Sequence, residues 1–154
     1  MNKTLARLCQ WHQAGETLAA WLNPLVLLLL RLYLFRVFFL SGLTKLRDWD
    51  TTLLLFSEEY HVPLLPPELA AVMGTFGELV MPVLLLLGIF GRFAAASLFM
   101  INLMAFVSYR HVLLLPNAHA AALDHLEWGL LILVLVAQGS GRWSLWRSKV
   151  AAAV

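Results

Sequence analysis

Four long apolar stretches constrain this chain most strongly, because each has about the length that a helix needs to cross a membrane. They cover residues 24–46, 69–88, 93–109 and 121–138, and the third is the shortest. A spanning helix needs about 20 residues, since each residue adds about 1.5 Å along a hydrocarbon core of about 30 Å. The sequence therefore predicts an all-α fold, an integral membrane four-helix bundle.

Composition and charge exclude several other classes of protein. The 154 residues are 61% hydrophobic and 13% charged, with a mean hydropathy of +0.79, which is too apolar for a soluble domain of this length. A net charge of +2 without a basic patch predicts no nucleic-acid partner. The single cysteine, Cys9, excludes an intrachain disulfide and a CxxC pair. We therefore expect one membrane domain with lipid around it.

The lysine and arginine residues predict the orientation, because cytoplasmic loops collect them. One side of the predicted bundle carries six of these residues and the other carries three, so both termini are expected in the cytoplasm. The richer side holds Lys3, Arg7, Arg92, Arg142, Arg147 and Lys149, and the other holds Lys45, Arg47 and Arg110.

The pattern of apolar and polar residues divides the chain into three segments. Residues 1–23 have apolar positions at helical spacing and are expected to form an amphipathic helix in the membrane interface, with a cytoplasmic docking arm as the alternative. Residues 24–146 form the four-helix transmembrane domain, and residues 147–154 form a cytoplasmic tail. The long loop after the first span is expected to hold a short interfacial helix or lid before its prolines.

Ionisable residues at membrane depth are the first candidates for a site, because burying them in lipid is unfavourable. Arg31 and Lys45 lie on one face of the first span. Arg36 points elsewhere, and we expect a protein contact for it rather than lipid. Glu78, in the second span, should be protonated or paired with a cation. We expect that cation to be Arg31, with Lys45 as the alternative.

The third and fourth spans add further polar candidates. Asn102 is expected either to contact a ligand or to hold two helices together by a hydrogen bond. Glu127 is a second candidate for moving protons, and Trp128 could form a flat apolar wall or an ordinary interfacial contact. On the outer side, a divalent metal such as zinc or copper(II) would suit the side chains present there, although their spacing matches no metal motif. The metal candidates are His61, His111, His119, Asp124 and His125.

The chain resembles the DoxX family of small bacterial four-helix membrane proteins over about residues 25 to 146. The order and spacing of several short motifs carry this resemblance. The sequence departs from the family pattern at Phe35 and Arg36, and the outer histidines are not part of it. The motifs are Arg31 with Phe38, Ser41-Gly42-Leu43-Thr44-Lys45-Leu46, Val62-Pro63, Gly77-Glu78 with Pro82, Gly88 and Arg92, and Gly139-Ser140-Gly141-Arg142-Trp143-Ser144-Leu145.

The resemblance implies a multi-pass protein of the bacterial cytoplasmic (inner) membrane that belongs to respiratory or detoxifying redox systems. Family members include membrane subunits of thiosulfate:quinone oxidoreductases, and others accompany soluble metal-dependent enzymes. The residues themselves show no nucleophile with a base, no phosphate loop, no haem attachment motif and no iron–sulfur cysteine set. A redox function would therefore depend on a bound quinone or on a partner protein.

The residues and the resemblance together leave three possible functions to test. The first is a membrane subunit of a redox complex that binds quinone between its helices, so that any enzyme activity would be that of a quinone-linked oxidoreductase. Arg31 or Lys45 would donate to a quinone carbonyl, Glu78 or Glu127 would move a proton, and Phe35, Phe38, Phe76 and Trp128 would form walls. The alternatives are a non-catalytic anchor for a soluble enzyme and a small proton-coupled transporter. A soluble or membrane protein partner is expected, and a homo-oligomer is an alternative.

Overall fold

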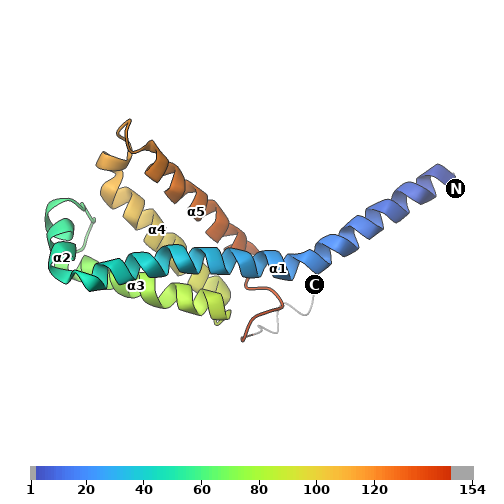
Figure 1. Cartoon of the computed structure of the whole chain (residues 1–154), viewed down its shortest axis with the longest axis horizontal. Coiled ribbons are helices and arrows are strands. Elements are labelled where there is room, and N and C mark those ends of the chain that lie inside the picture. Colours follow the sequence, from blue (N-terminus) through green and yellow to red (C-terminus); the bar gives the residue numbers. More distant parts are fainter. Residues whose placement is uncertain (1–2, 147–154) are drawn as a thin grey trace.

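The computed structural model describes residues 3–146 and consists of five helices in that range (Figure 1). Four of them are long and apolar enough to span a membrane, which confirms the predicted all-α membrane bundle. The fifth, α2, is the short helix expected in the first loop. The predicted tail, residues 147–154, lies outside the described residues. The helices are α1 (Lys3–Arg47), α2 (Trp49–Glu58), α3 (Pro67–Leu87), α4 (Gly91–Leu113) and α5 (His119–Gln138).

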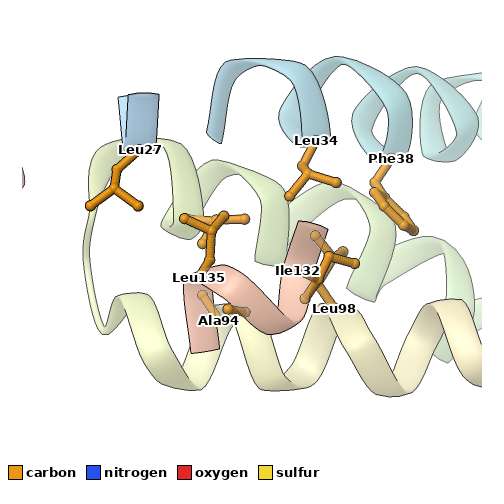
Figure 2. Close-up of a cluster of buried hydrophobic side chains, with 9 residues drawn as sticks. Leu27, Leu34, Phe38, Ala94, Leu98, Ile132 and Leu135 are labelled. Carbon is orange, nitrogen blue, oxygen red and sulfur yellow. The ribbon is translucent and has the colours of Figure 1, made fainter. Parts of the chain in front are cut away.

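The four long helices form a closed bundle around one apolar core. Helix α1 packs against α3 and α5, and α4 packs against α3 and α5. Side chains of α1, α4 and α5 meet in this core, where the small Ala94 of α4 lies next to Leu135 of α5 (Figure 2). The buried members of this core are Leu27, Leu34, Phe38, Leu85, Ala94, Ala95, Leu98, Ile132 and Leu135.

Local signals in the sequence define several helix ends. The carboxylate of Asp48 accepts a hydrogen bond from the backbone N–H of Thr51 at 3.0 Å and so caps α2. Helix α3 begins with Pro67, whose missing N–H would have no partner there in any case. It ends at Gly88, which has a φ of 69° that a residue with a Cβ adopts only under strain.

Helix α1 differs from the expectation of a separate N-terminal segment, because residues 3–47 form one continuous helix. Its 45 residues extend about 67 Å at 1.5 Å per residue, more than twice the hydrocarbon thickness. Pro24 lies inside the helix, where a proline removes one backbone hydrogen bond and favours a bend. The N-terminal part leaves the bundle (Figure 1), and Trp11 in it is 77% exposed.

Candidate functional site

A cavity of about 450 Å³ lies in the half of the bundle that faces α2. All five helices and the loop after α2 contribute to its wall, which is mostly apolar. Phe56 of α2 packs on Ala70 and Ala71 of α3, so the short helix covers this end of the bundle. The polar and aromatic residues of the wall include Ser41, Lys45, Tyr60, Glu78, Ser108, Tyr109, His125 and Trp128.

An ion pair between α1 and α3 forms the most polar part of the cavity wall. Lys45 Nζ lies 2.6 Å from Glu78 Oε2, and the two side chains are 20% and 9% exposed. The same ammonium donates to Ser41 Oγ at 2.9 Å, one helical turn earlier. An ammonium group has three N–H donors, so two are used here and one can reach a ligand in the cavity.

Arg31 is therefore not the partner of Glu78, and the expectation that it would be is wrong. Its guanidinium is fully buried near the opposite end of the bundle. It donates to three backbone carbonyl oxygens: that of Leu27 at 3.4 Å, that of Leu86 at 3.1 Å and that of Trp143 at 2.6 Å. These contacts join α1 to the C-terminal turn of α3 and to the segment after α5. Arg31 is not among the cavity residues, and its contacts are structural.

Asn102 joins α4 to α5 through His125, which confirms the interhelical hydrogen bond considered from the sequence. Asn102 Nδ2 donates to the backbone oxygen of His125 at 2.8 Å. Asn102 Oδ1 lies 2.9 Å from His125 Nδ1, and an amide oxygen only accepts, so Nδ1 carries the proton. The other ring nitrogen of neutral His125 is then an acceptor on a side chain that lines the cavity. Asn102 positions this histidine but does not itself line the cavity.

Aromatic rings surround the polar groups. Trp128 stands edge-on to Phe38 and to His125, with ring centroids 5.8 Å and 5.1 Å apart. It thus forms the wall that the sequence suggested. Phe35, Phe38 and Phe76, the other expected walls, are not among the lining residues.

Two tyrosines lie at the edge of the cavity, Tyr60 in the loop after α2 and Tyr109 on α4. Tyr60 and Tyr109 stand edge-on with ring centroids 5.1 Å apart, and the hydroxyl of Tyr109 donates to Glu59 Oε2 at 3.3 Å. Burial, followed by the neighbouring groups Tyr109, Glu59 and Glu78, raises the pKa of Tyr60. Its phenol therefore keeps its proton at neutral pH.

The cavity also reaches the outer surface of the bundle between α3 and α4. Met73 and Met100 belong to its wall and are 53% and 54% exposed. Helices that span a membrane expose such surfaces to lipid.

The outer histidines do not come together as a set of five. The rings of His61 and His111 are 4.6 Å apart between centroids, whereas His125 is held by Asn102. Among residues 3–146, no group of three or more His, Cys, Asp or Glu side chains is placed to share a metal ion. The geometry gives no support to a metal site built from His61, His111, His119, Asp124 and His125.

Glu127 lies outside the cavity on the exposed surface of α5, and Arg36 is exposed on α1. The sequence reasoning also missed several lining residues, namely Ser41, Ser108, Tyr60, Tyr109 and the methionines. Only Ser41 left a usable signal, because it lies four residues before Lys45 and so shares its helix face.

Comparison with known proteins identifies a family. A family model, DoxX, matches residues 26–111, which is more than half of the chain. The same comparison gives no match among curated proteins or solved structures. The matched range contains α1 from its entry into the bundle, together with α2, α3 and most of α4, and so includes Lys45 and Glu78.

Proposed function

Because the chain belongs to the DoxX family of membrane proteins, we propose that it is the quinone-binding membrane subunit of a redox complex. The observation that carries this proposal is the Lys45–Glu78 ion pair in the wall of an apolar cavity inside a membrane bundle. A quinone needs apolar surroundings for its ring and tail, and a few polar groups for its two carbonyl oxygens.

The size and lining of the cavity fit such a ligand. Its volume of about 450 Å³ is within the range of small-molecule sites. Trp128 and Tyr60 offer flat ring surfaces, and the methionines adapt to irregular shapes. The hydroxyl of Ser108, on the same wall, is buried and has no hydrogen-bond partner in the described part of the chain, which supports a polar ligand group nearby.

The polar groups match both states of a quinone. A quinone accepts two electrons and two protons and so carries reducing equivalents between proteins in a membrane. The free N–H of Lys45 would donate to a carbonyl oxygen, whereas the acceptor nitrogen of His125 would take a hydrogen bond from a hydroxyl group. Glu78, held by Lys45, is the carboxylate nearest to such a ligand and would accept a proton from it.

Binding of a short-chain quinone analogue tests the proposal. The protein is purified in a mild detergent, bound lipid is analysed by mass spectrometry, and the analogue is titrated against tryptophan fluorescence. We expect co-purified quinone in the unmodified protein. Lys45→Met should weaken binding of the analogue by roughly tenfold or more, because it removes a charge-assisted hydrogen bond in an apolar site.

A matched pair of carboxyl variants separates the site from general effects of charge. Glu78→Gln changes the cavity, whereas Glu68→Gln changes an exposed carboxylate at the start of the same helix. Binding should fall in the first and stay unchanged in the second. Absence of co-purified quinone together with unchanged binding in Lys45→Met would refute the proposal.

The anchor function remains a second candidate because of the N-terminal part of α1. This part leaves the bundle (Figure 1). Its exposed Trp11 and Trp21 are side chains that a soluble enzyme could contact. Removal of residues 1–20 should then abolish co-purification of a stoichiometric soluble partner while the bundle stays folded. Retention of that partner by the shortened protein would exclude this arm as the anchor.

A further inference from the structure

Two charged residues lie on the lipid-facing surface of the bundle at the middle of their helices. Arg36 is exposed on α1, near the centre of the part of that helix that packs in the bundle. Glu127 is exposed near the centre of α5. No hydrogen bond or ion pair joins either side chain to the rest of residues 3–146. Such charges are unfavourable against lipid and therefore indicate a protein contact.

Both residues lie at the same level of the membrane. Trp128 Nε1 donates to the hydroxyl of Tyr33 at 3.2 Å, and the ring of Trp128 contacts that of Phe38. Arg36 lies between these two α1 residues, and Glu127 immediately precedes Trp128. The two charges are therefore on neighbouring helices at one depth.

Each charge belongs to a row of exposed side chains with the same spacing. On α1 the row is Leu29, Tyr33, Arg36 and Leu40, with steps of four, three and four residues. The α5 row has the same steps and consists of Leu123, Glu127, Leu130 and Val134. This spacing is that of helices that pack side by side in bundles and coiled coils.

The two rows lie on one face of the molecule. Helices α1 and α5 are neighbours that run in opposite directions (Figure 1). Each residue of a helix is rotated by about 100° around the helix axis from the one before it. By this rotation, each row lies roughly a quarter turn from the side of its helix that packs against the other helix. The opposite directions of the helices place both rows on the same outer side of the pair.

We propose that this α1–α5 face binds the same face of a second copy of the chain, with Arg36 of each copy paired with Glu127 of the other. A two-fold axis along the membrane normal keeps every residue at its depth and sets α1 of one copy against α5 of its partner. The helices are then antiparallel, and the equal steps bring the rows into register. Leu40 meets Leu123, Tyr33 meets Leu130, and Leu29 meets Val134.

The charges select a second copy as the partner. The face carries one positive and one negative charge, so rotation by a half turn matches each with its opposite. A different membrane protein would need to supply both charges at the same depth and spacing. The proposal is independent of the cavity, because neither row contains a residue that lines it.

Charge reversal in two separately tagged copies tests the pairing. Arg36→Glu alone places two acidic groups opposite each other at both contacts, and Glu127→Arg alone places two basic groups there. Each single variant should lose self-association by more than roughly tenfold. The two variants mixed should form a heterodimer, because every contact then joins opposite charges again. Pull-down through one tag and detection of the other measures this recovery.

A cysteine pair checks the register without changing any charge. In a Cys9→Ser background, Leu40→Cys in one copy and Leu123→Cys in the other should give a disulfide-linked dimer on mild oxidation. Met73→Cys in place of Leu40→Cys is the control, because Met73 has a similar exposed fraction, 53% against 48% for Leu40, but lies on α3. A monomer at all concentrations in lipid nanodiscs, or single variants that associate as well as the mixture, would overturn the proposal.

Discussion

Replacement of Lys45 by methionine breaks the ion pair with Glu78 and the hydrogen bond to Ser41 but keeps most of the apolar stem. In the structure, Glu78 is the less exposed member, at 9% of its side chain against 20% for Lys45. Loss of the lysine therefore leaves the more deeply buried group without its counter-charge. Loss of the glutamate leaves an ammonium that still donates to Ser41 and can turn toward the membrane surface.

The expected magnitudes follow from this asymmetry. Loss of one partner of a buried pair usually costs roughly 3 to 5 kcal/mol, and Lys45→Met should cost this much at pH 7 because Glu78 loses its counter-charge. Glu78→Gln removes one charge-assisted hydrogen bond and should cost about 1.5 to 3 kcal/mol. The double variant with methionine at both positions should cost less than the sum, because no buried charge remains.

Equilibrium unfolding in mixed micelles, followed by tryptophan fluorescence, measures these differences. At pH 7, Lys45→Met should lower the unfolding midpoint by roughly 6 to 20 °C, given about 2 to 4 °C per kcal/mol for a chain of this size. At pH 5 the loss should be smaller, because protonation of the carboxylate then costs less. Glu68→Gln, the exposed control, should stay within about 0.5 kcal/mol of the unmodified protein.

Additive losses in the two single variants would refute the reasoning, since they would show that the residues do not interact. A loss in Lys45→Met that is equal at pH 7 and pH 5 would also refute it. In that case the carboxylate would not be the source of the cost.

Four further outcomes are expected. Arg31→Met should lower the free energy of unfolding by about 3 to 5 kcal/mol and speed proteolysis after residue 139, because three carbonyl oxygens lose their donor. Hydrogen bonds from Thr51 hold the pKa of Asp48 below its ordinary value. Hydrogen-exchange protection of α2 should therefore be complete above about pH 4 and should be lost as the pH falls through that lowered pKa. Asp48→Asn should not show this loss of protection at low pH. Gly88→Ala should lower the unfolding temperature because φ is 69° at this position, whereas Gly15→Ala should stabilise its exposed helix by about 0.5 to 1 kcal/mol. A cysteine at Asp50 in a cysteine-free background should react with an impermeant reagent only from outside the cell; reaction only from the cytoplasm would reverse the predicted orientation.

The helices of the bundle were predictable from the sequence because long apolar runs have few alternatives in a membrane. The start of the first helix was not predictable in this way. Pro24 suggested the start of a new helix, yet α1 continues through it. A proline in a helix removes one hydrogen bond but does not prevent the turns on either side from forming, so the sequence alone does not separate a bend from a boundary.

Arg31 was preferred over Lys45 as the partner of Glu78 because the register between α1 and α3 depends on packing, which the sequence does not show. Alignment of the helix ends would place Glu78 near Arg36. The structure instead brings Gly42 against Glu78 and Leu79, so closely that a Cβ on Gly42 would lie 3.1 Å from the Cβ of Glu78. The difference is six residues along α1, or about 9 Å. A glycine that permits close approach sets this register, and hydropathy does not reveal it.

Arg31, which is buried, and Lys45, which is partly exposed, show that the residue type decides which partners a cation on this face of α1 binds. Both lie on one stripe of the helix, yet one binds backbone carbonyl oxygens and the other binds a carboxylate. Arginine has five donors in a flat, rigid group, which suits the three carbonyl oxygens that converge on Arg31 from separate segments. Lysine is a compact charge with three donors, which suits Ser41, Glu78 and one further acceptor. Exchange of the two residue types would therefore leave carbonyl oxygens without donors at one end of the bundle and crowd the cavity at the other, although the charge of the chain would be unchanged.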